Sequence, residues 1–159
     1  MYKSVKFSLK RFLFFMILSL GTGALSALLT MNSTREVFNS IKQPPLTPPA
    51  AVFPVVWTIL FFLMGISSFI VSGSRSEYKN KALIIFFVQL IINFTWSPLF
   101  FIAQMYFAAF ICIVLLWIAI IAMIYYFYKV NPVAAFLQIP YLLWVTFAGY
   151  LNFMIYRLN

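Results

Sequence analysis

Long runs of apolar residues, each about twenty positions long, dominate the pattern along the chain. A helical run of this length crosses the hydrocarbon core of a bilayer, because each residue adds about 1.5 Å to a span of about 30 Å. The sequence has five such runs and therefore predicts five membrane-spanning helices. Their approximate bounds are 12–30, 51–72, 82–102, 107–128 and 133–156.

The segments that connect these runs differ in length and character. The first connection, Met31–Ala50, is polar and rich in proline, whereas the third, around Ala103–Tyr106, is only a few residues long. The sequence shows no internal repeat and no stretch polar enough for a second domain. It therefore predicts an all-α membrane protein, with a single domain over residues 1–159 built as a five-helix bundle.

The first apolar run also resembles a secretory signal peptide. Basic residues precede it, and the small-residue tract Ala24–Ala27 is typical of a cleavage site. Against this interpretation, the apolar run continues through Leu28 and Leu29. Gly23 and Ala27 also have the spacing at which small residues let two membrane helices approach closely. We therefore expect a membrane helix here, with cleavage as the alternative.

The basic residues lie at the ends of the apolar runs and are divided unequally between the two sides of the membrane. The chain has a net charge of +9. The amino-terminal side carries Lys3, Lys6, Lys10, Arg11, Arg75, Lys79, Lys81 and Lys129, and the other side carries Arg35, Lys42 and Arg157. This asymmetry predicts a cytoplasmic amino terminus, in a bacterial inner membrane. The spread of charge fits lipid head groups and argues against nucleic acid as a partner.

The residue types that the spans lack restrict the chemistry. The sequence has no histidine, its one cysteine, Cys112, lies within an apolar run, and Glu36 and Glu77 are assigned to loops. Ion-coupled transporters usually carry an ionisable group within the membrane, and hydrolytic enzymes need a general acid or base. We therefore expect neither a coupled pump nor a hydrolase, and we predict no catalytic residue and no metal ligand.

Polar and aromatic residues recur at helical spacing on one face of three predicted spans. They are Phe53, Trp57, Phe61 and Met64 in the second span, Gln89, Asn93, Trp96 and Ser97 in the third, and Tyr141, Trp144, Ala148, Leu151 and Asn152 in the fifth. An amide within the membrane is costly without a partner, so the face of Asn93 is expected to point into the bundle. Asn93 then either ties two helices together or contacts a ligand. Pro98 is expected to kink the third helix or to end its regular part.

Four prolines within six positions stiffen the first connection: Pro44, Pro45, Pro48 and Pro49. Each ring fixes its own backbone angle and disfavours helix at the preceding residue, so the segment should be extended and should lose little entropy on docking. Pro48 and Pro49 also suit the first turn of the second helix. The segment is then either a rigid connector or a lid over a ligand pocket.

Three stretches, taken in order, resemble the translocator protein/tryptophan-rich sensory protein (TspO/MBR) family. They are PPLTPPAAVFPVVWTILFFLMG, QLIINFTWSPLFF and IPYLLWVTFAGYLNFMIYRLN, within a resemblance that runs from about Ser40 to Asn159. The resemblance implies a five-helix fold, often homodimeric, with a pocket capped by the first loop. The residues implied to line the pocket are Pro48, Phe53, Trp57, Asn93, Trp96, Ser97, Phe100, Trp144, Phe147, Ala148 and Leu151.

Two positions depart from the family pattern. Leu46 occupies a place where the family commonly has tryptophan, which reduces aromatic contact with the edge of a porphyrin. Tyr156 is followed directly by Arg157, without the intervening residue of the cholesterol motif, which weakens the expectation of sterol binding. The third span also lacks small residues at the spacing of a helix seam, so the sequence itself does not support a dimer.

The resemblance implies a receptor or sensor that binds a tetrapyrrole such as protoporphyrin IX, or a sterol-like molecule, with no resident cofactor. An aromatic pocket with few polar groups and no catalytic set fits this role. Arg35 or Lys42 would meet the propionates of a porphyrin. The alternatives are a carrier that moves porphyrins or sterols across the bilayer, and an enzyme that degrades porphyrin under light, for which Trp57 and Trp144 are the candidate residues.

Overall fold

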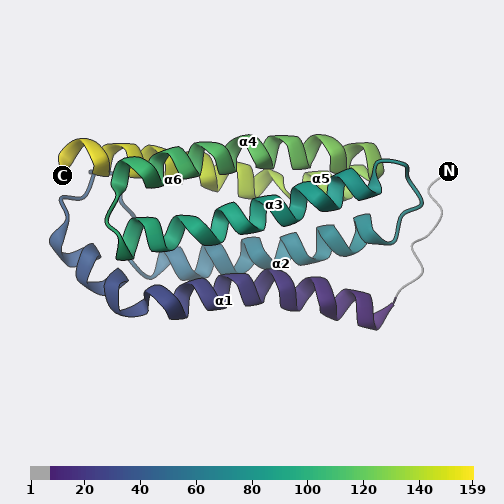
Figure 1. Ribbon diagram of the computed structural model, residues 1–159, viewed down its shortest axis with the longest axis horizontal. Helices are drawn as coiled ribbons and strands as arrows, with labels where there is room; N and C mark the ends of the chain where they lie inside the picture. The colour runs from purple at the N-terminus through teal and green to yellow at the C-terminus, as the bar shows by residue number, and fades with distance from the viewer. Residues whose placement is uncertain (1–7) are drawn as a thin grey trace.

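The computed structural model describes residues 8–159, which form long helices lying side by side (Figure 1). The long helices are α1 (Leu9–Ser40), α2 (Val52–Ser72), α3 (Lys79–Ser97), α4 (Tyr106–Val130) and α6 (Ile139–Leu158). Two short elements are the π-helical turn η1 (Pro98–Ile102) and α5 (Pro132–Phe136). Over this part of the chain, five segments are long and apolar enough to cross a bilayer, and none is a strand. The predicted all-α, five-span architecture is confirmed.

The first helix is longer than the sequence predicted. It continues to Ser40, so the expected connection over Met31–Ala50 was wrong in its first half, and Glu36 lies on a helix rather than in a loop. The polar extension is stabilised by tertiary packing, because Val37 is buried in a cluster with Phe100 and Ala109. A pattern of local polarity carries no information about such a distant partner.

Pro98 ends the regular part of α3, as predicted. Proline has no backbone N–H to continue the α-helical ladder, and the chain widens there into η1. The wider turn is closed by the N–H of Ala103, which donates to the carbonyl of Pro98 over 2.9 Å. Gln104 then takes a positive φ of 52°, which turns the chain into α4.

The last apolar run, predicted as one span, is broken into α5 and α6. Asn131 caps α5 by accepting hydrogen bonds at its side-chain oxygen from the backbone N–H of Val133 and of Ala134. The single turn ends near Leu137, and α6 begins just before Pro140, which stands in its first turn. Because proline there cannot donate to the turn before it, the break falls at that point.

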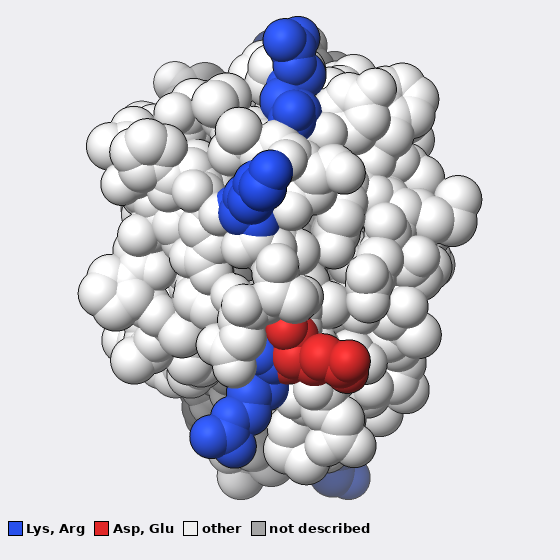
Figure 2. Space-filling view, turned by 90° about the vertical axis from the view of Figure 1, so that its left-hand side faces the viewer, with Lys and Arg blue, Asp and Glu red and all other residues white. Residues whose placement is uncertain are grey.

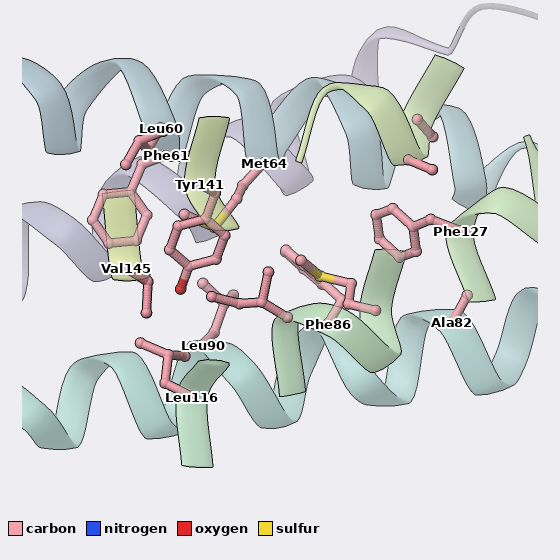
Figure 3. Close-up of a cluster of buried hydrophobic side chains, with 14 of the residues drawn as sticks. Leu60, Phe61, Met64, Ala82, Phe86, Leu90, Leu116, Phe127, Tyr141 and Val145 are labelled. Carbon is pink, nitrogen blue, oxygen red and sulfur yellow. The ribbon is translucent and has the colours of Figure 1, made fainter. Parts of the chain in front are cut away.

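The most extensive contacts between helices are those of α1 with α2, α3 with α4, and α4 with α6. A buried cluster between the helices forms the main core, with Phe61 and Met64 from α2, Phe86 from α3 and Tyr141 from α6 (Figure 3). Within residues 8–159, the backbones of α2 and α6 barely approach each other, although both helices contribute to this core. The space between them therefore has to be filled by long side chains.

The alternating directions of the helices gather most of the basic residues at one end of the bundle. In the described part of the chain these residues are Lys10, Arg11, Arg75, Lys79, Lys81 and Lys129, while Lys3 and Lys6 lie outside it. The opposite end, viewed in Figure 2, shows scattered basic side chains and a small acidic area among uncharged side chains. The chain is an integral multi-pass membrane protein.

Candidate functional site: an aromatic groove between α2 and α6

A groove of about 410 Å³ lies between α2 and α6. It is lined by Val56, Ile59, Leu60, Pro140, Leu143, Trp144 and Phe147. The groove opens sideways, because Ile59 and Leu143, which are 53% and 66% exposed, form its rims. The sequence predicted a pocket enclosed within the bundle and capped by a lid. That enclosed pocket stays a prediction, and the space found beside Trp144 is a groove that is open to the side of the bundle.

Aromatic side chains bridge the separation between α2 and α6 at the loop end of the groove. The ring of Phe53 on α2 meets the ring of Trp144 on α6 edge to face, with 5.8 Å between centroids. On either side, Phe38 of α1 contacts Phe53 at 6.0 Å, and Trp144 contacts Phe147 at 5.7 Å. Such pairs are stabilising beyond the area that they bury, so the separation is maintained by ring contacts rather than by backbone packing.

Trp144 also carries an unused hydrogen-bond donor. Its indole Nε1 is buried and has no hydrogen-bonding partner within residues 8–159. A buried donor without a partner costs about 1–3 kcal/mol, and such groups are uncommon in folded proteins. An acceptor on a molecule in the groove would remove this cost once the indole ring turned toward it.

A chain of buried side chains connects three helices beside the groove. The side-chain amide of Asn93 donates to the hydroxyl oxygen of Tyr141 over 2.8 Å, and this hydroxyl donates to Oε1 of Gln89, also over 2.8 Å. Nε2 of Gln89 donates to the sulfur of Met64 over 3.6 Å. The sequence left two roles open for Asn93, and the observed contact is a tie between α3 and α6.

Trp57 packs against this chain rather than against Trp144. Its ring lies 6.2 Å from that of Tyr141 and 5.8 Å from that of Phe61, measured between centroids. The sequence placed both tryptophans in one pocket. In the structure Trp144 lines the groove, whereas Trp57 packs against Tyr141.

Trp96 and Phe100 lie in a second aromatic cluster toward the loop end. Their rings stack at 5.1 Å, beside the buried residues Val37 and Ala109. The indole N–H of Trp96 donates to the side-chain oxygen of Asn152 over 2.8 Å. The indole N–H of Trp96 therefore has a partner within residues 8–159, unlike that of Trp144.

The remaining predicted residues lie apart from the groove lining. Ala148 and Leu151 are buried on α6, Ser97 is half-buried at the end of α3, and Pro48 is half-buried in the first loop. Of all the predicted site residues, Trp144 and Phe147 line the groove directly, and Phe53 closes one end of it.

Sequence reasoning did not select Gln89, Tyr141, Val56 or Leu60 as site residues. Gln89 and Tyr141 were visible as members of the polar stripes, and their positions facing Asn93 could have suggested the hydrogen-bonded chain. Val56 and Leu60 carry no comparable signal, because an aliphatic residue in an apolar run resembles every other lipid-facing position.

Comparisons with known proteins agree with this architecture. The sequence model of the TspO/MBR family matches residues 14–157 of this chain. The chain is 38% identical over 144 residues to the tryptophan-rich protein TspO of Chlorobaculum tepidum, covering 89% of this chain and 91% of that protein. It is 34% identical over 124 residues to the tryptophan-rich sensory protein of Cereibacter sphaeroides, covering 78% and 77% of the two chains.

Similarity extends to animals, since the translocator protein of Bos taurus is 30% identical over 149 residues, covering 92% of this chain and 88% of that protein. These relatives carry the names of translocators and sensory proteins rather than of enzymes. With the family match and the five-helix architecture in agreement, the chain belongs to the TspO/MBR family of membrane proteins.

Proposed function

We propose that this chain is a membrane receptor or sensor that binds a flat, apolar ligand with acidic edges, such as protoporphyrin IX, in the groove between α2 and α6. The observation that carries the proposal is the groove itself, about 410 Å³ in volume and lined by apolar and aromatic side chains. Sites for small molecules commonly have this size and this kind of lining.

The chemistry of the groove suits a planar aromatic ligand. Trp144 and Phe147 offer ring faces and edges, and the unpartnered N–H of Trp144 offers one directional contact. Because the groove opens toward lipid, a ligand dissolved in the bilayer reaches it without crossing water. Lys42, exposed in the loop at the same end of the bundle as Phe53, offers a positive charge for a propionate.

Two substitutions in the groove test this proposal. Val56→Phe places a ring in the space that the ligand would occupy, and Trp144→Phe removes the free N–H together with part of the aromatic surface. We expect each change to raise the dissociation constant for protoporphyrin IX by about tenfold or more, the equivalent of losing about 1.4 kcal/mol. Titration in detergent, followed by the absorbance of the porphyrin, measures the constant without relying on tryptophan emission.

The matched control is Trp117→Phe. Trp117 lies on α4 and donates its indole N–H to Thr146, so it has a partner and does not line the α2–α6 groove. This variant should bind protoporphyrin IX as the wild type does. Equal affinity in all four proteins, at unchanged helix content, would show that the ligand does not bind in this groove.

We also propose that the amino terminus faces the cytoplasm and that the membrane is a bacterial inner membrane. The support is the unequal distribution of charge, with six basic residues of the described part of the chain near the amino-terminal end and three at the other. A homodimer is a further proposal, supported by the family resemblance alone.

A further inference from the structure

The side chain of Asn159 holds the start of the first loop against the end of α6. Its Oδ1 accepts a hydrogen bond from the backbone N–H of Lys42 over 2.9 Å. Its Nδ2 donates to the carbonyl of the same residue over 3.1 Å, and also to the carbonyl of Ile155 over 3.0 Å. One side-chain amide therefore pairs with both backbone groups of Lys42, in the manner of a neighbouring strand.

The loop beyond this contact has little freedom. Gln43 donates through its side chain to the carbonyl of Phe38, and the N–H of Thr47 donates to the carbonyl of Pro44 over 3.0 Å. Pro44 is buried, and the remaining prolines restrict the backbone up to the first turn of α2. Residues 42–51 therefore behave as one stiff segment, which we call the strap.

The two ends of the strap meet the two helices that line the groove. At one end the strap is hydrogen-bonded to Asn159 at the end of α6, and at the other it continues into α2 at Val52. Figure 1 shows the loop rising to the carboxyl end of the chain before it reaches α2. The strap thus connects α6 to α2 at the loop end of the groove. The ring contact between Phe53 and Trp144 connects the same two helices next to it.

We propose that Asn159 is a positioning residue that fastens the strap to α6 and so limits how far α2 and α6 separate. The contact is suited to reversible release, because Lys42 and Asn159 are both exposed and water can replace each bond. When the contact opens, this tie between the strap and α6 is lost, and a ligand held between α2 and α6 leaves more readily. The ligand part of this inference rests on the proposed function, whereas the contact itself does not.

Trypsin offers a test that needs no ligand, made in an Arg157→Gln background because a cut after the exposed Arg157 would itself remove Asn159. The peptide bond after Lys42 is followed by Gln43 and can be cleaved once the backbone leaves Asn159. We expect Asn159→Ala to speed this cleavage by at least about fivefold in detergent, because local opening governs proteolysis of a folded chain. Arg75 is exposed between α2 and α3, and the rate of cleavage after it serves as the internal reference for the rate of cleavage after Lys42.

Two further variants separate the hydrogen bonds from side-chain size and from general loosening. Asn159→Asp keeps the size but replaces the donor that faces the carbonyl of Lys42, and it should also accelerate the cut. Asn32→Ala, which changes an exposed asparagine of α1, should not. Unchanged cleavage after Lys42 in the Asn159 variants, or an equal increase after Arg75, overturns the inference.

The ligand arm measures how fast protoporphyrin IX dissociates. We expect release from the Asn159→Ala variant to be several times faster than from the wild type. If the cut after Lys42 accelerates while the release rate stays the same, the strap does not control the groove and the inference fails. If the wild type binds no porphyrin, the proposed function fails, and the proteolysis still decides whether Asn159 fastens the loop.

Discussion

At the scale of single residues, the hydroxyl of Tyr141 joins two buried amides of α3. It receives a hydrogen bond from Asn93 and donates one to Gln89, and all three side chains are buried. Figure 3 shows Tyr141 reaching from α6 into the middle of the core cluster. In a medium without water, the N–H of Asn93 and the side-chain oxygen of Gln89 depend on that hydroxyl for their hydrogen bonds, while Nε2 of Gln89 donates to Met64.

Tyr141→Phe should therefore destabilise the fold by more than the loss of one contact. The substitution keeps the ring but leaves one buried donor on Asn93 and one buried acceptor on Gln89 without their partner, and we expect a loss of about 1–2 kcal/mol in the free energy of unfolding. Thermal unfolding in detergent measures it. Tyr150→Phe, at an exposed position of the same helix, is the control and should be neutral. Equal midpoints for the two variants would refute the role assigned to Tyr141.

The same scale shows how far a sequence can identify a site. The stripe containing Tyr141 and Trp144 was recognisable from helical spacing alone, because period and face are local properties. The sequence did not show which of those residues would form hydrogen bonds with one another, since this depends on the distance between two helices. Trp96 and Trp144 looked equivalent in the sequence, yet one donates to Asn152 and the other has no partner in residues 8–159.

At the scale of helices, Gly65 allows the backbones of α1 and α2 to approach closely. A Cβ atom built at Gly65 would lie 2.6 Å from the sulfur of Met16, 3.2 Å from its Cα and 3.3 Å from the carbonyl oxygen of Phe15. Two of these neighbours are backbone atoms, which cannot move without shifting the whole of α1. Glycine is required here by close approach, as is common between membrane helices.

Gly65→Ala is accordingly expected to separate α1 from α2 and to lower stability by about 1–3 kcal/mol, the usual cost of overpacking. Gly21→Ala is the matched control, because a Cβ at Gly21 meets nothing within 4 Å and alanine favours helix. Denaturation by SDS in mixed micelles, followed by circular dichroism, ranks the two variants. A Gly65→Ala protein as stable as the Gly21→Ala protein would contradict the close approach.

At the scale of the whole molecule, α2 and α6 both contribute to the core without a close approach of their backbones, and aromatic rings and the strap connect them. The groove therefore follows from the assembly of five helices and belongs to no single one. The charge asymmetry is also a whole-molecule property, because it appears only when alternating helices bring Lys10, Arg75 and Lys129 to the same end.

Orientation in the membrane can be tested with single cysteines at the two ends. A membrane-impermeant maleimide, added to cells whose outer membrane has been opened, should label Ala50→Cys in the first loop but not Asn80→Cys at the start of α3. Labelling after solubilisation confirms that both sites react, and the buried Cys112 should react slowly in either state. The reverse pattern would place the amino terminus outside the cytoplasm.

The sequence by itself determined the number of spans, their approximate bounds and the break at Pro98. These depend on the length of apolar runs and on the backbone chemistry of proline, which act within one turn or one span. Only the tertiary structure decided that α1 continues to Ser40, that Asn93 ties to Tyr141, and that the open space lies between α2 and α6. Each of these depends on contacts between residues far apart in the chain, and burial against a distant partner can override local polarity.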